Sequence, residues 1–222
     1  MIKAKQKPIA EIKEMIAPYS KVLLLGCGTC VTISFAGGEK EVGLLASSLR
    51  IASAMDGQEK TFAEATVQRQ CEWEFIDAVA DPIKRADAVV SLACGIGVQA
   101  LAERYPDKVI LPGVNTAFLG MAVEHGVLVE RCRACGDCVL GLTGAVCPIA
   151  RCAKNLLNGP CGGSQKGKCE VNPETDCAWQ LIYDRLSRLG QLDRLDVIRP
   201  PKDWSKDYDG GPRKIVREDL KL

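Results

Sequence analysis

The first half of the chain alternates between short apolar runs and longer stretches with helical periodicity. The clearest run, Lys21 to Gly26, is continuously apolar and ends in glycine, as a strand buried on both faces does. The whole pattern predicts strands over 21–26, 62–67, 87–93 and 109–113 and helices over 8–16, 38–55, 75–85 and 98–104. Strands that alternate with helices form a parallel sheet covered on both faces. We therefore predict an α/β fold with a Rossmann-like domain over residues 1–128.

The pattern changes near Glu130, where cysteine becomes frequent and apolar runs become rare. Glycine-rich stretches predict a small loop- and helix-rich domain over residues 129–198, which ends in an amphipathic helix over 179–192. Prolines, glycines and charges of both signs then predict an extended tail over residues 199–222. Trp204 and Tyr208 are large anchors for such a tail, so it is either an arm that binds a partner subunit or a plain tail.

Composition excludes several classes of function. The formal net charge of the 222 residues is +1 and aromatic residues make up 5%, so we expect no nucleic-acid partner. No apolar stretch approaches the roughly 20 residues of a membrane span, and the first residues lack the pattern of a secretory signal. We therefore expect a cytoplasmic protein whose thiols stay reduced, and metal binding is favoured over a disulfide framework.

Eight of the twelve cysteines lie in the predicted second domain. They are Cys132, Cys135, Cys138, Cys147, Cys152, Cys161, Cys169 and Cys177. The first three form C-x2-C-x2-C and Cys147 precedes a proline, which resembles the start of a bacterial ferredoxin motif. The later spacing is too long for a ferredoxin. Eight thiolates can hold two [4Fe–4S] clusters, one such cluster and one zinc ion, or two zinc ions.

Cysteines also follow the predicted strands of the first domain, namely Cys27, Cys30, Cys71 and Cys94. Because parallel strands bind ligands beyond their carboxyl ends, we expect these thiols to converge on one zinc ion or one [4Fe–4S] cluster. Two other interpretations stay open. Gly26-Cys27-Gly28 can begin a dinucleotide-binding loop, although Val31 leaves that motif incomplete. Cys71 or Cys94 can be a small buried apolar side chain.

The sequence contains no convincing set of catalytic residues. Its one histidine, His125, is placed on a predicted helix with Met121 to Val123, where packing or capping is more common than catalysis. No base–nucleophile pair accompanies it. The pair Cys27 and Cys30 has the spacing of a thiol redox enzyme, but that interpretation leaves the eight clustered thiols unexplained.

Three segments of the second half carry a resemblance to a known family. They are Asn158-Gly-Pro160-Cys161-Gly-Gly163-Ser164, Gly167-Lys-Cys169-Glu-Val171 and Cys177-Ala-Trp179-Gln-Leu-Ile-Tyr183-Asp-Arg185-Leu186. Residues from about 132 to 199 resemble the methylenetetrahydrofolate reductase C-terminal family. As a whole, the chain is similar to the small cysteine-rich subunit of the methylenetetrahydrofolate reductase of acetogenic bacteria, which works in the Wood-Ljungdahl pathway of one-carbon metabolism.

This resemblance implies a partner subunit, a TIM barrel that carries flavin and reduces methylenetetrahydrofolate to methyltetrahydrofolate. It also implies iron–sulfur clusters, with zinc suggested at one site, and an electron donor such as a ferredoxin or an NADH-linked subunit. Only the twelve cysteines carry over as functional residues, and they would hold two or three [4Fe–4S] clusters. Our hypothesis is an electron-transfer subunit of the reductase complex, and the alternative is a structural zinc-binding module that scaffolds it.

Overall fold

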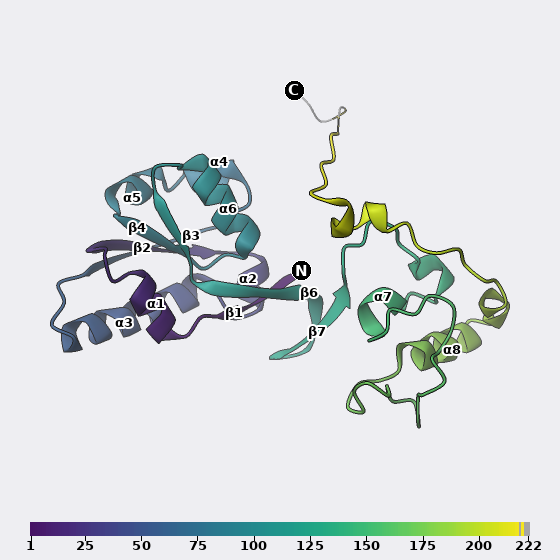
Figure 1. Cartoon of the computed structure of the whole chain (residues 1–222). Helices are drawn as coiled ribbons and strands as arrows, with labels where there is room; N and C mark the ends of the chain where they lie inside the picture. Colours follow the sequence, from purple (N-terminus) through teal and green to yellow (C-terminus); the bar gives the residue numbers. More distant parts are fainter. Residues whose placement is uncertain (218, 220–222) are drawn as a thin grey trace. The chain divides into compact units, whose positions relative to one another are not determined.

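The computed structural model describes residues 1–217 and 219 and divides the chain into two compact units, Met1–Val129 and Glu130–Leu222 (Figure 1). Residues 218 and 220–222, at the end of the predicted tail, lie outside the described residues. None of the helices among the described residues is long and apolar enough to cross a membrane.

The first unit is built on a parallel sheet of four strands in the order β3-β2-β4-β5 (Figure 1). The strands are β2 (Lys21–Cys27), β3 (Thr61–Val67), β4 (Ala88–Ser91) and β5 (Val109–Pro112). All four apolar runs that predict strands are therefore confirmed. β2 lies in the interior of the sheet and is buried from Val22 to Cys27, which explains why its sequence is apolar without alternation.

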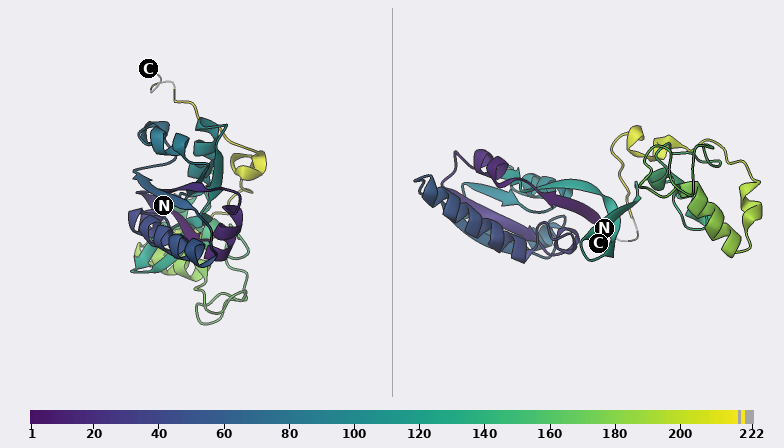
Figure 2. Two further views of the ribbon diagram at one scale, coloured as in Figure 1. Left: turned by 90° about the vertical axis from the view of Figure 1, so that its left-hand side faces the viewer. Right: turned by 90° about the horizontal axis from the view of Figure 1, so that it is seen from below.

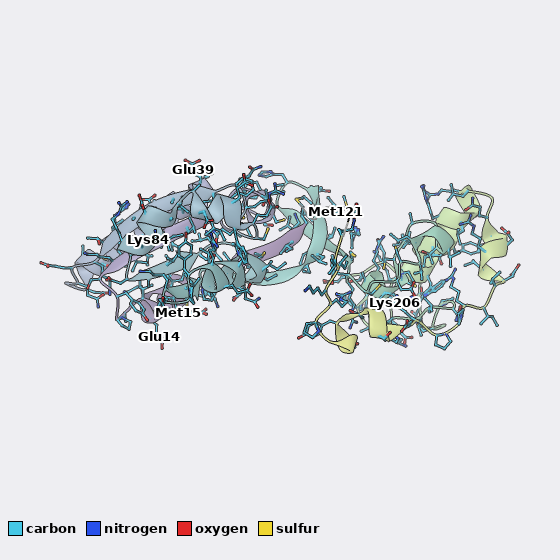
Figure 3. All side chains as sticks on the ribbon, turned by 90° about the horizontal axis from the view of Figure 1, so that it is seen from above. Glu14, Met15, Glu39, Lys84, Met121 and Lys206 are labelled. Carbon is cyan, nitrogen blue, oxygen red and sulfur yellow. The ribbon has the colours of Figure 1, made fainter. Side chains whose placement is uncertain are left out.

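Helices cover both faces of this sheet (Figures 1 and 2). They are α1 (Ile9–Met15), α2 (Cys30–Ile33), α3 (Glu39–Met55), α4 (Trp73–Asp77), α5 (Ala80–Arg85) and α6 (Gly95–Arg104). Leu24 of β2 joins the core formed with α1 and α3, whereas Leu25 joins the core formed with α4, α5 and α6. The predicted α/β architecture with a parallel sheet is confirmed. Figure 3 labels Glu39 at the start of α3.

The single helix predicted over 75–85 is wrong, because the segment forms two short helices, α4 and α5. The chain leaves helical geometry at Val79, whose φ and ψ are −117° and 25°. Pro82 explains the break, since proline in a helix interior removes a hydrogen bond and clashes with the preceding turn. With α5 starting at Ala80, Pro82 stands in the first turn, where proline is tolerated.

A second, antiparallel sheet has the order β1-β6-β7. Its strands are β1 (Ile2–Gln6), β6 (Val114–Glu124) and β7 (Val127–Cys132), none of which the sequence pattern predicts. The expected helix around His125 is wrong: Met121 lies in β6, and His125 stands in the turn to β7. Gly126 has a φ of 79°, a left-handed conformation that suits a tight hairpin turn.

The second unit contains short helices joined by loops. They are η1 (Leu140–Leu142), α7 (Pro148–Arg151), α8 (Ala178–Arg188), η2 (Leu192–Leu195), η3 (Trp204–Lys206) and η4 (Tyr208–Gly210). The predicted amphipathic helix is confirmed as α8. Its residues Trp179, Ile182 and Leu186 are buried and form the centre of a small core. The indole nitrogen of Trp179 donates a hydrogen bond to the Leu156 carbonyl oxygen at 3.0 Å.

A pair of substitutions tests the double-sided core of the first unit. Leu24 is fully buried, so Leu24→Ala removes apolar contacts and leaves a cavity. We expect it to lower the free energy of unfolding by about 2–5 kcal/mol. Leu44 on α3 is 59% exposed, and Leu44→Ala is the control, with an expected change within about 0.5 kcal/mol. Denaturant unfolding followed by circular dichroism measures both; equal losses would contradict the core described here.

Candidate metal centres

The four strand-end cysteines lie at the carboxyl edge of the parallel sheet. Cys27 ends β2, Cys30 begins α2, Cys71 follows β3, and Cys94 precedes α6. After β2 the chain continues to α3, which packs in the core on one face of the sheet. After β4 it continues to α6, which packs in the core on the opposite face. The loops after these two adjacent strands therefore diverge, and open α/β sheets bind their ligands at such a point.

A buried glutamine fixes the loop that carries Cys71. The side-chain nitrogen of Gln70 donates hydrogen bonds to the carbonyl oxygens of Leu25 at 2.8 Å and Gly26 at 2.9 Å. Its side-chain oxygen accepts a hydrogen bond of 2.6 Å from the Ser91 hydroxyl. The loop after β3 is thus tied to the ends of both β2 and β4. Sequence analysis missed Gln70, because nothing in its neighbourhood distinguishes it from a surface glutamine.

This arrangement brings three of the four strand-end thiols near one another. Cys27 is buried in the core against which Cys94 packs, and the Cys27 sulfur lies 3.7 Å from the Thr29 hydroxyl. Partial burial raises the pKa of the Cys71 thiol, and the nearby charges of Cys27 and Cys94 raise it further. Cys30, one turn beyond Cys27, is partly buried at the start of α2.

The C-x2-C-x2-C segment of the second unit forms a tight loop. Ala134 and Gly136 have φ values of 58° and 77°, and these left-handed residues turn the backbone between the cysteines. The backbone N–H of Ala134 donates to the Cys132 sulfur at 3.3 Å. The fourth cysteine, Cys147, caps α7 and accepts a hydrogen bond of 3.4 Å from the N–H of Ala150. Backbone N–H groups that point at sulfur stabilise thiolates that bind metals.

The remaining four cysteines line one cavity, namely Cys152, Cys161, Cys169 and Cys177. Two of them lie on the two strands of a short antiparallel hairpin: the N–H of Cys169 donates to the Thr175 carbonyl at 2.9 Å, and that of Cys177 donates to the Gly167 carbonyl at 2.7 Å. Cys152 and Cys177 also pack against the core around Trp179. Three separate stretches of sequence therefore contribute thiols to the same space.

Backbone donors surround the Cys169 sulfur. Hydrogen bonds from the backbone of Asn172 and, more weakly, Val171 and Ala153 lower the pKa of this thiol, and the charge of Lys154 lowers it further. A thiolate held in this way is a ready ligand for a soft metal. The sequence alone gives no indication that Cys169 differs from its neighbours.

A larger cavity of about 500 Å³ adjoins this group at Cys177. Its wall includes Trp179, Tyr183, Val197 and Arg199. The Arg199 guanidinium donates to the carbonyl oxygens of Leu157 at 2.9 Å and Leu142 at 3.0 Å, so it braces the wall. Cys177 thus lies between the thiol-lined cavity and an open recess.

Part of the predicted tail packs against the C-x2-C-x2-C loop. Lys202 donates to the Asp137 carbonyl at 2.6 Å, and Arg213 donates to the Ala134 carbonyl at 2.7 Å. A side chain at Gly136 would clash with the carbonyl oxygen of Lys206, a residue labelled in Figure 3. We name residues 202–213 the strap, because they cover this loop. Whether the tail also serves as a partner-binding arm stays a prediction.

The donor set fits a soft metal, since all twelve cysteines carry free thiols and thiolates are the ligands of zinc and iron–sulfur clusters. Across residues 1–217 and 219, no group of three or more His, Cys, Asp or Glu side chains already has the arrangement of a metal site. The assignment of the twelve cysteines to metals therefore stays a prediction.

The two shifted thiols should become reactive toward alkylation at different pH values in the reduced, metal-free chain. Because the pKa of Cys169 is lowered and that of Cys71 is raised, Cys169 should react with iodoacetamide at a lower pH than Cys71. Mass spectrometry of peptides alkylated over a pH series gives the midpoint of each residue. Lys154→Ala should move the Cys169 midpoint upward and leave the Cys71 midpoint unchanged. The reverse order of midpoints would contradict the environments described here.

Comparison with known families relates part of the chain to a described family. The model of a family described as "Methylene-tetrahydrofolate reductase C terminal" matches residues 111–205, which include all eight cysteines of the second unit and less than half of the chain. Comparison with curated proteins gives no match, and comparison with solved structures gives none. The cysteine-rich segment is therefore related to the C-terminal family of methylenetetrahydrofolate reductases, as its resemblance predicts.

Proposed function

We propose that this chain is the iron–sulfur subunit of a methylenetetrahydrofolate reductase complex. It passes electrons to the flavin of a TIM-barrel catalytic subunit, which reduces methylenetetrahydrofolate to methyltetrahydrofolate. The observation that carries this proposal is the single cavity that four of the eight thiols of the second unit line. We propose that the eight thiols act as two groups of four. The first group is Cys132, Cys135, Cys138 and Cys147, and the second is Cys152, Cys161, Cys169 and Cys177.

The first group has the features of a cluster-binding loop. Three cysteines are spaced by two residues, and the left-handed residues Ala134 and Gly136 let the loop wrap tightly. N–H groups donate to the sulfurs of Cys132 and Cys147, which makes a thiolate-bound cluster easier to reduce. The strap is hydrogen-bonded to the loop through Lys202 and Arg213.

The second group is supported by the shared cavity and by the hairpin whose two strands carry Cys169 and Cys177. Cys177 also lines the larger recess, which offers this group a route to a redox partner on the surface. The aromatic side chains of Trp179 and Tyr183 line that recess. We propose that the flavin subunit approaches here and that a ferredoxin or an NADH-linked subunit supplies electrons.

The chemistry of a thiolate set agrees with electron transfer rather than with substrate conversion. A [4Fe–4S] cluster, when bound, exchanges one electron at a time, and a flavin accepts electrons singly or in pairs. The protein's own residues would hold the cluster and donate hydrogen bonds to its ligands. The related family, the methylenetetrahydrofolate reductases, supplies the substrate class of the proposed complex.

A structural zinc module is the second candidate, and it is favoured by the small core of the second unit. Three buried side chains of α8 form the centre of that core, so metal ions could supply much of its stability. The two candidates differ in the metal and in the redox response.

Anaerobic purification of the full chain, followed by assays of iron, sulfide and zinc, decides between them. We expect about eight irons in the second unit and a broad visible band that bleaches on reduction. Cys138→Ser and Cys161→Ser should each remove about four irons, because each belongs to a different group. Ser164→Ala, which changes the same cavity as Cys161, is the control and should keep all of them. Zinc without iron would overturn the electron-transfer function.

A further inference from the structure

We infer that the strap, residues 202–213, is a working part of the C-x2-C-x2-C loop and that Lys202 is its positioning residue. The Lys202 ammonium holds the loop in place and offsets the negative charge that thiolates bring there. This inference rests on the proposed role of the first group of four thiols as metal ligands, but it does not rest on iron as the metal.

The first argument is a carbonyl oxygen that two groups share. The Lys202 ammonium donates to the Asp137 carbonyl oxygen at 2.6 Å, and the Cys135 thiol donates to the same oxygen at 3.7 Å. A thiol that binds a metal releases its proton to water. The Asp137 oxygen would then face a negatively charged sulfur, and that contact is unfavourable unless a cation stays at the oxygen. Lys202 therefore makes the loop compatible with a metal-bound Cys135.

The second argument is burial. The Lys202 side chain is 2% exposed, whereas the Asp137 carboxylate, 3.7 Å from its ammonium, is 43% exposed. Water screens an exposed carboxylate, so it balances the buried ammonium only in part. Arg133 differs, because its carboxylate partner, Asp207, is itself buried. Lys202 is thus a buried cation whose charge remains available to nearby thiolates.

The third argument is the close fit between the strap and the loop. A Cβ atom at Gly136 would lie 2.3 Å from the Lys206 carbonyl oxygen. Arg213 donates to this oxygen at 2.9 Å and to the Ala134 carbonyl oxygen at 2.7 Å. These contacts hold the strap backbone against the loop and keep the Lys202 ammonium in place.

The buried ammonium should have two effects on a metal centre in this loop. Four thiolates carry more negative charge than a zinc ion or an oxidised [4Fe–4S] core offsets, so the ammonium should slow the release of metal. An added electron increases that negative charge, so the ammonium should also raise the reduction potential of a cluster.

The test compares Lys202→Met with Lys206→Met in the full chain, purified without oxygen and checked by circular dichroism. Lys206 lies on the same strap (Figure 3), but its side chain is 55% exposed and its partner Asp203 is 51% exposed. We expect Lys202→Met to release metal to a colorimetric chelator about tenfold faster than Lys206→Met, because loss of a group that supports metal ligands commonly weakens binding by this factor. Equal release from the two variants would overturn the inference.

A redox titration with dithionite, followed by electron paramagnetic resonance, gives a readout that a purely structural role would not move. Cys161→Ser is the background for this titration, because it removes a ligand of the second group. At a fixed potential, Lys202→Met should lower the ratio of reduced to oxidised cluster about tenfold, which is about 59 mV for a one-electron couple. Lys206→Met should leave the ratio unchanged. The same ratio in both variants would rule out the role of the Lys202 charge.

Cys138→Ser separates this inference from the proposed function. It removes a ligand of the first group, so the addition of Lys202→Met should not change the release of the metal that remains. An effect that persists in this background would show that Lys202 acts outside the first group and would overturn the inference. Zinc without iron would overturn the electron-transfer function alone, since metal release still tests Lys202. A first group that binds neither metal would overturn both.

Discussion

The carboxyl edge of the parallel sheet depends on the buried side-chain amide of Gln70. Its two donor hydrogen bonds reach the carbonyl oxygens at the end of β2, and its oxygen accepts from Ser91 at the end of β4. An unpaired amide at this depth would be unfavourable by roughly 1–3 kcal/mol, so the three partners must stay in place together. One side chain thereby fixes the relative positions of three loops, and each of these loops carries cysteine. The placement of the thiols follows from this network before any metal is considered.

The two units differ in what stabilises them. The first unit buries apolar side chains on both faces of its sheet, and its cysteines lie at the edge of a complete core. The second unit has a small core around Trp179, Ile182 and Leu186, and much of its chain is loop. Small domains with little core commonly rely on metals or disulfides, and here all cysteines are free. We therefore expect metal loss to unfold the second unit and to leave the fold of the first largely intact.

The parallel sheet was predictable because its strands are buried on both faces and appear in the sequence as continuous apolar runs. β1, β6 and β7 were not predictable in the same way, since they have mixed polarity and pair across the length of the unit: Ile2 lies opposite Leu119. The expected helix around His125 is wrong for this reason, because Met121 to Val123 are apolar but belong to β6, the central strand of the antiparallel sheet. The cysteines as candidate ligands were evident from spacing. The grouping of these cysteines was not evident from the sequence, because Cys152 and Cys177 both reach the same region only by packing against the core around Trp179.

The strap shows how a segment without core-forming residues can still be ordered. Trp204 lies under two cations, with the Arg133 guanidinium 5.7 Å and the Lys202 ammonium 5.8 Å from its ring centre. Asp207 is almost fully buried and lies 3.5 Å from the Arg133 guanidinium. Arg133 is one residue after Cys132, so these contacts connect the strap directly to the first thiol group. Composition alone assigns this segment to a tail, but its cations Lys202 and Arg213 contact the metal-binding loop. Their positive charges would offset the negative charge of thiolates in that loop.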